Sequence, residues 1–186
     1  MLKKQISSLA IDICSKFSLE DKKSQEILDT NIGVSEFLEA LRNKGLYRDA
    51  IRFLSHALPK REAIWWSCVC IRSSDIILEK QNLDSLETTE DWVRTLSEEN
   101  RLKARDAALI EKLETPTSWA AISAFWSQGS IAPPSAPIVL ASESLSPNAV
   151  SGAIILAGVL QNPQNSSTKY ENFLQKGIDI GNEERG

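Results

Sequence analysis

Histidine and cysteine, the residues that most often carry chemistry or hold metals, are scarce in this chain. It has one histidine, His56, and three cysteines among 186 residues. No two cysteines have the two-residue gap of a metal knuckle or a redox motif. Cys68 and Cys70 stand two positions apart on an expected helix, so their side chains point about 200° apart and cannot chelate one ion. The sequence therefore predicts no metal site and no cofactor, and it favours reduced cysteines buried as small apolar residues.

Long apolar runs are missing as well. The run at residues 149–160 has about 12 residues and is too short to cross a bilayer. Near the N-terminus two lysines precede an apolar stretch, as they do in signal peptides. However, Gln5 and Asp12 interrupt that stretch, and no small-residue cleavage site precedes Cys14. We therefore expect a cytoplasmic protein without membrane insertion.

Short motifs of nucleotide and hydrolase chemistry are also absent. The chain has no GxxxxGK(S/T) loop and no GxGxxG loop after a strand. Neither GxSxG nor HExxH occurs. These absences exclude the familiar sites of those enzyme classes, although an unfamiliar active site remains open.

Residues 42–61 are basic within a chain whose net charge is only −4. They include six Lys or Arg residues and one acidic residue, a local charge of +5 (six minus one). Lys60 and Arg61 stand in the first turn of an expected helix, where the helix dipole disfavours cations, so we expect acidic side chains or an anionic ligand as their partners. Contact with acidic neighbouring helices is the simpler explanation. A nucleic-acid surface is the weaker alternative, because interleaved exposed aromatics are lacking, and we expect no nucleic-acid partner.

Apolar residues recur at helical spacing along almost the whole chain. One stripe that should face inward consists of Tyr47, Ile51, Leu54 and Leu58. Arg48, Arg52 and Ser55 follow a neighbouring line and should face outward. A second helix starts at Pro59, and residues 63–71 of it carry no charge. Such a helix is normally surrounded by others, which places it at the centre of the fold, with Trp65 or Trp66 in the core.

The sequence predicts an all-α fold: an irregular multi-helix bundle of roughly eight to ten short helices with one long Pro-rich loop. No segment alternates polar and apolar residues next to hairpin turns, so no strand is expected. No 34-residue repeat of the tetratricopeptide kind is found. The expected organisation is a single helical domain over residues 1–180 with a frayed tail at 181–186.

Capping and breaking residues predict the other boundaries. Ser18 and Ser35 should cap the second and third helices, and Thr115 or Thr117 should begin a helix that ends near Trp126. The polar residues 79–89 are expected to form a connection. Further helices are expected over residues 2–17, 91–113, 147–160 and 168–177. In the 147–160 helix, Gly152 and Gly158 indicate that another backbone crosses closely, because glycine is otherwise unfavourable there.

Residues 129–147 contain four of the seven prolines and form the long irregular segment. We expect this loop to be ordered and packed, because its prolines limit the freedom of the unfolded chain. Trp126 should anchor it by stacking on Pro133 or Pro134, and Ile131 offers an apolar side chain that can pack against the helices. The spacing from Pro134 to Pro137 also fits PxxP, although a packed loop explains it better.

Three segments carry a family resemblance: DAIRFLSHALPKREAIWWSCVC at 49–70, AFWSQGSIAPPSAP at 124–137 and NAVSGAIILAG at 148–158. In order and spacing they resemble an uncharacterised family of small bacterial helical proteins. The resemblance implies a bacterial protein of unknown activity, and the genes of that family often lie near type VI secretion components. Two departures are Gln128, which stands at a position that is usually glycine, and a less proline-rich segment at 138–144. No catalytic residue is established for the family.

His56 is the residue on which an enzymatic hypothesis would depend. A catalytic histidine needs an orienting acid, which Glu62 or Asp49 could supply, and Arg61 lies nearby in sequence. Yet His56 precedes a proline beside an inward stripe, where capping its own helix or binding a buried carbonyl is the commoner role.

We therefore predict a non-catalytic binding or adaptor module with a protein partner, associated with a bacterial secretion apparatus. The predicted contact residues are Arg48, Arg52, Lys60, Arg61, Ile131, Pro133 and Pro134. The alternative is an enzyme of unknown reaction centred on His56, Arg61 and Glu62. Convergence of those three groups in a pocket would favour the enzyme, and their dispersal would favour the module. Oligomeric state is not predicted.

Overall fold

Helices make up all the regular elements of residues 9–133 and 135–182, which the computed structural model describes. The described residues contain no strand, and two isolated antiparallel bridges join Leu9 to Gly33 and Ser130 to Leu140. The all-α prediction is confirmed. The elements are α1 (Ala10–Cys14), α2 (Lys22–Ile27), α3 (Val34–Asn43), α4 (Tyr47–Ala57), α5 (Lys60–Arg72), α6 (Lys80–Thr95), α7 (Glu98–Ile110), α8 (Pro116–Trp126), α9 (Leu145–Val159), the 3-10 helix η1 (Pro163–Asn165) and α10 (Ser166–Asn182).

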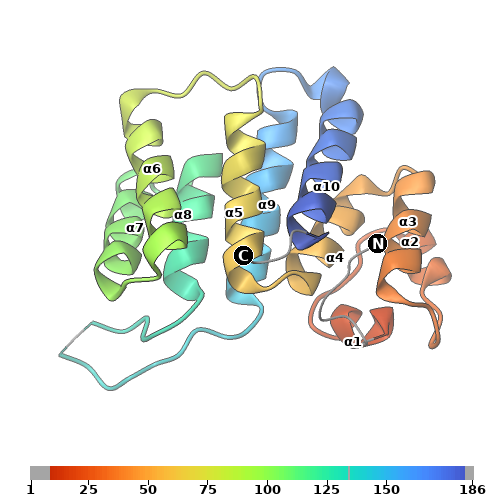
Figure 1. Cartoon of the computed structure of the whole chain (residues 1–186), viewed down its shortest axis with the longest axis horizontal. Helices are drawn as coiled ribbons and strands as arrows, with labels where there is room; N and C mark the ends of the chain where they lie inside the picture. Colours follow the sequence, from red (N-terminus) through yellow and green to blue (C-terminus); the bar gives the residue numbers. More distant parts are fainter. Residues whose placement is uncertain (1–8, 134, 183–186) are drawn as a thin grey trace.

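The α5 helix lies at the centre, as its uncharged sequence predicted. Figure 1 shows α6, α7 and α8 on one side of it, α4 and α10 on the other, and α9 behind. Of the two adjacent tryptophans, Trp66 lies in the core, whereas Trp65 is half-buried. The indole N–H of Trp66 donates to the Phe173 carbonyl of α10 at 2.6 Å. Because a Cβ at Gly177 would lie 2.6 Å from the Trp66 ring, only glycine lets α10 approach this closely.

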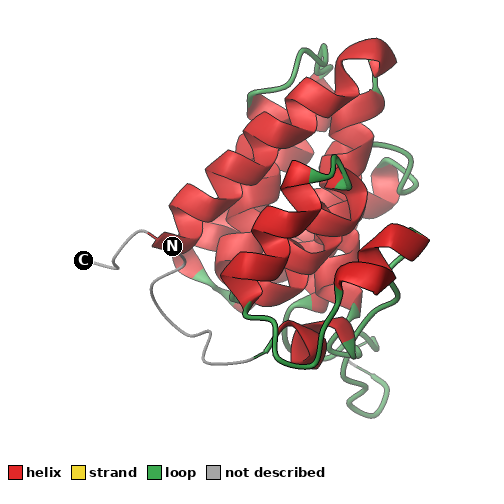
Figure 2. Cartoon of the chain, turned by 90° about the vertical axis from the view of Figure 1, so that its right-hand side faces the viewer, coloured by secondary structure: helices red, strands yellow, loops and turns green. Residues whose placement is uncertain are grey.

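The α8 and α9 helices pack through small residues. Their buried faces include Ala120, Ala124, Ala149 and Ala153, which let two helix axes approach closely. Figure 2 shows the long helices from the side, running alongside one another with loops at their ends.

The glycines of α9 have different surroundings from those expected. At Gly158 a Cβ would overlap the ring of Tyr170, so this glycine accommodates an aromatic side chain and not another backbone. The Tyr170 hydroxyl donates to the Ile155 carbonyl at 2.9 Å. At Gly152 a Cβ would meet the Trp119 ring at 3.7 Å, an ordinary contact. The close backbone crossing predicted at these two positions is therefore wrong.

Residues 79–89, expected to be a connection, belong almost entirely to α6. The inward face of α6 mixes polar and apolar residues, namely Ser85, Leu86, Thr89, Glu90, Trp92 and Val93. Thr89 is buried because its hydroxyl donates to the Ser85 carbonyl at 2.8 Å within the helix. The expected helix over 91–113 is two helices, because Leu96 adopts φ 53° and Ser97 then caps α7 by accepting from the Asn100 N–H.

Several predicted caps and orientations near the N-terminal end are corrected. Asp21, not Ser18, caps α2 by accepting from the Lys23 N–H, and α3 begins at Val34, so Ser35 lies inside it. Ser55 faces inward and is buried.

The two chain ends differ from the expected boundaries. The first ordered helix starts at Ala10, and the predicted helix positions before residue 9 lie outside the described residues. At the other end, α10 continues past the predicted end at 177 to Asn182. Residues 181 and 182 are therefore helical, and the rest of the expected tail lies outside the described residues. None of the helices within the described ranges is long and apolar enough to cross a membrane.

Candidate protein-binding surface

A long loop joins α8 to α9, and we call its residues 128–144 the arm. Figure 1 shows the arm projecting beyond the lower ends of α7 and α8. Its outgoing and returning limbs meet at the antiparallel bridge between Ser130 and Leu140. The Ile131 N–H donates to the Val139 carbonyl at 2.8 Å, and the Val139 N–H donates to the Ser130 hydroxyl at 3.2 Å. These bonds tie the two limbs together, but residues 133 and 135–140 are exposed, so this part of the loop is not packed as predicted.

Arg101 of α7 anchors the base of the arm. Its side chain is 1% exposed, which is unusual for an arginine. The guanidinium donates to the Phe125 carbonyl at 2.8 Å and to the Ser130 carbonyl at 3.0 Å. It also donates to both carboxylate oxygens of Glu98, at 2.6 and 2.7 Å, and it lies 4.7 Å from the centre of the Phe125 ring. One cation thus links α7, the end of α8 and the arm.

Gly129 fits against this guanidinium. Its φ is +69°, and a Cβ built there would lie 2.9 Å from the Arg101 guanidinium carbon. Trp126, the expected anchor, is half-buried against the core. Arg101 was missed because it resembles the other charged residues of its helix. The one signal in the sequence was the glycine that follows α8.

Lys60 and Arg61 also reach the base of the arm. The Lys60 ammonium donates to the Ser127 carbonyl at 2.9 Å, and the Arg61 Nε donates to the Val93 carbonyl at 2.7 Å. These carbonyls lie at the C-terminal ends of α8 and α6, where cations are favourable. Neither side chain forms an ion pair within the described residues. Among the described residues, backbone carbonyls and not the expected acidic side chains are therefore the partners of both cations, which remain exposed to solvent.

The returning limb of the arm exposes three consecutive apolar residues. Ile138 is 79% exposed, Val139 48% and Leu140 70%. Residues 128–142 carry no charged side chain. The contact residues predicted from sequence lie on the other limb. Ile131 is half-buried against the core, Pro133 is exposed, and Pro134 lies outside the described residues.

The other two predicted contact residues lie across α5 from the arm. Arg52 forms an ion pair with Glu20 at 2.5 Å, and this bond holds the pKa of the Glu20 carboxyl below its ordinary value. Asp49 accepts from the Glu20 and Asp21 N–H groups, at 3.0 Å each. Arg48 is exposed and lines a cavity of about 400 Å³ between the starts of α4 and α10. Part of the basic segment is therefore paired internally, as the simpler explanation predicted.

Two groups of the enzymatic hypothesis, His56 and Arg61, bind different helices. His56 Nε2 lies 3.0 Å from the Asn148 Oδ1 of α9, and the imidazole stacks on Phe17 with ring centroids 4.6 Å apart. Burial lowers the pKa of His56 below its ordinary value, so its ring is neutral at pH 7. Arg61 instead donates to a carbonyl of α6. The cavity beside Arg48 is lined by none of His56, Arg61 and Glu62.

The cysteines are buried and free. Burial raises the pKa of Cys14 to about 12 and raises that of Cys68 as well, which keeps both as thiols. Within the residues that the structure describes, no group of three His, Cys, Asp or Glu side chains is placed to hold a metal ion.

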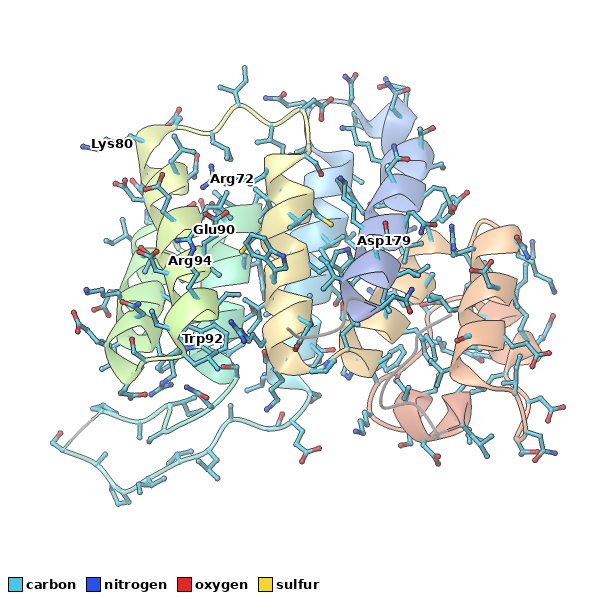
Figure 3. All side chains as sticks on the ribbon, in the orientation of Figure 1. Arg72, Lys80, Glu90, Trp92, Arg94 and Asp179 are labelled. Carbon is cyan, nitrogen blue, oxygen red and sulfur yellow. The ribbon has the colours of Figure 1, made fainter. Side chains whose placement is uncertain are left out.

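An ion pair between an exposed arginine and a buried carboxylate joins α5 to α6. Figure 3 shows Glu90 between Arg72 and Arg94. Arg72 donates to both carboxylate oxygens of Glu90, at 2.8 and 2.9 Å, and Arg94 lies 3.9 Å away. Glu90 is only 7% exposed, so we assign this group to helix packing.

The comparisons with known proteins identify a family without a known activity. Residues 37–181, from α3 into α10, match a family that is described as a family of unknown function (DUF6931). No significant match exists among curated proteins or among solved structures. The match spans α3 to α10, including the whole arm and its anchor Arg101. Because it covers well over half of the chain, the protein belongs to this family of unknown function.

Proposed function

We propose that the protein is a non-catalytic binding module that recognises a protein partner through the arm. The observation that carries this proposal is the exposure of Ile138, Val139 and Leu140 on a loop that a buried arginine fixes at its base. Contiguous apolar side chains exposed to water are typical of interaction sites. A loop that is already ordered loses less conformational entropy on binding, so more of the contact energy becomes affinity.

The chemistry of the arm favours a protein over a membrane or a nucleic acid. Residues 128–142 contain no Lys or Arg, so the arm does not attract phosphates or anionic headgroups. The nearby Lys60 and Arg61 each use one donor on a backbone carbonyl. An interface of ordinary size needs about 800 Å² from each partner. The arm supplies the apolar part of that area. The exposed residues at the start of α5 and at the end of α6 supply a polar rim.

The enzymatic alternative has less support, because His56 and Arg61 bind groups on different helices. The setting we propose is the bacterial cytoplasm, with a component of a secretion apparatus as the partner. The support for this setting is the family resemblance alone. The proposed binding unit is one helical domain.

Photo-crosslinking in the native host tests the proposal. Benzoylphenylalanine replaces Leu140 in one tagged full-length chain and Ile77 in another. Ile77 is 80% exposed and lies in the α5–α6 connection, at the opposite end of the helices from the arm. We expect a discrete protein adduct from position 140 and none from position 77.

The adduct partner is then purified and its affinity for the chain is measured. The double change Ile138→Asp and Leu140→Asp should weaken binding at least tenfold, because two buried contacts become desolvated charges. Ile77→Asp should leave the affinity unchanged. Identical adducts from both positions, or full affinity of the double variant, would show that the arm is not the binding surface.

A further inference from the structure

The hydrogen bonds of the arm leave one edge of the returning limb unused. Ser130 and Leu140 form an antiparallel pair in which Ile131 N–H bonds the Val139 carbonyl. The Val139 N–H also points to the first limb, where it meets the Ser130 hydroxyl. Both backbone groups of Val139 are therefore occupied inside the arm.

In extended chain, successive residues direct their backbone groups to opposite sides. The N–H and C=O groups of Ile138 and Leu140 thus face away from the first limb. Neither residue makes a hydrogen bond within the described part of the chain. Residues two apart in a strand also place their side chains on one face, and here both side chains are largely exposed. Unpaired backbone and exposed apolar side chains coincide at the same two residues.

We propose that residues 138–140 accept an extended segment of the protein partner as an added β-strand. The segment has apolar residues at alternate positions, opposite Ile138 and Leu140, and an acidic residue at the end nearer Lys60 and Arg61. Main-chain hydrogen bonds hold such a strand, and its alternate side chains determine specificity. The inference rests on the proposed function and adds the kind of segment that the arm recognises.

A second copy of the chain is a poorer occupant of this edge. Two arms paired edge to edge would join only three residues from each chain, far below the roughly 1,200 Å² that stable interfaces bury. Residues 128–142 of the arm carry no charge, so two copies have no electrostatic complementarity along this edge. By contrast, a segment of a different protein can continue from the arm toward the exposed cations Lys60 and Arg61.

The probe is the capped synthetic peptide Asp-Glu-Ile-Thr-Val-Thr-Ile, titrated into the purified full-length chain. Amide chemical shifts and hydrogen exchange at Ile138 and Leu140 report its binding. Two variants of this peptide are matched controls, one N-methylated at its single valine and one at the threonine that follows it. A peptide residue that lies opposite Ile138 or Leu140 has its side chain on the same face as that residue and points its N–H toward the arm. The apolar valine takes such a position, so its N–H bonds the arm, whereas the N–H of the following threonine points away. We expect methylation at valine to weaken binding at least tenfold and methylation at threonine to change it less than twofold.

A change in the protein gives the complementary test. Leu140→Pro removes an N–H that makes no bond inside the arm, whereas Leu140→Ala keeps that N–H and removes the side chain. Both changes should weaken peptide binding, and Leu140→Pro should weaken it several-fold more than Leu140→Ala. Unchanged helical circular dichroism identifies variants that fold.

The outcomes separate this inference from the proposed function. Absence of peptide binding at millimolar concentration, or equal binding of the two methylated variants of the peptide, overturns strand addition. In that case the function stands if crosslinking and the double aspartate variant still implicate the arm. If those also fail, the arm has no partner and both proposals fall.

Discussion

Gly129 occupies a position that no other residue type fits without cost. Its left-handed φ of +69° disfavours any side chain, and the Arg101 guanidinium fills the space where a Cβ would be. Arg101 itself donates to the buried Phe125 carbonyl and to the part-buried Ser130 carbonyl. The geometry of the arm therefore depends on a pair of residues on different elements.

Gly129→Ala should lower the free energy of unfolding by about 1 to 2 kcal/mol, the cost of a left-handed non-glycine residue. The matched change is Gly152→Ala, because a Cβ there makes an ordinary 3.7 Å contact inside a helix. That variant should gain up to about 1 kcal/mol. Urea denaturation measures both. If both variants shifted the urea midpoint by the same amount, the left-handed backbone at Gly129 and its contact with Arg101 would not be special to stability.

The α5 helix is the element on which the core depends. Ile64 is fully buried and Trp65 is half-buried, although both belong to the uncharged run. The run alone placed the helix at the centre but did not distinguish the two neighbouring tryptophans. That distinction depends on α10, which crosses α5 at Gly177 and whose Phe173 carbonyl accepts a hydrogen bond from the Trp66 indole N–H.

Ile64→Ala should cost about 2 to 5 kcal/mol of stability, because it leaves a cavity among packed helices. Trp65→Ala should cost less, since part of that side chain already contacts water. Chemical denaturation followed by circular dichroism gives both values. A loss below about 0.5 kcal/mol for Ile64→Ala, the range of surface changes, would contradict the central position of α5.

The α4–α9 contact should make stability depend on pH. Burial lowers the pKa of His56 in the folded state, so the unfolded chain binds its proton first as pH falls. Stability contributed by the neutral ring is complete above the unfolded pKa of about 6.5 and declines as pH falls below it toward the folded value. Thermal unfolding between pH 8 and pH 5.5 measures this decline. In His56→Gln the decline should be shallower, and an identical slope would assign it to other groups.

At the scale of the whole molecule, helix content and the central element follow from sequence because they depend on local charge and spacing. The polar helix α6 was missed, because buried hydroxyls such as that of Thr89 bond within their own helix and look exposed in sequence. The arm anchor was missed for a related reason. Arg101 binds backbone carbonyls that only the tertiary fold brings to it. Whether Ile138 and Leu140 are buried or exposed is likewise a tertiary property, since their segment has the same composition in either case.

The unused edge of the arm also has a cost when the partner is absent. An exposed apolar edge can pair with any extended chain, and this is how many proteins begin to aggregate. The next residue on that edge, Ala136, already donates its N–H to the Pro133 carbonyl at 2.9 Å, so pairing does not extend past residue 138 in that direction. This turn keeps the exposed apolar edge short. We expect the free protein to aggregate more readily than a protein whose three apolar residues are covered by a partner.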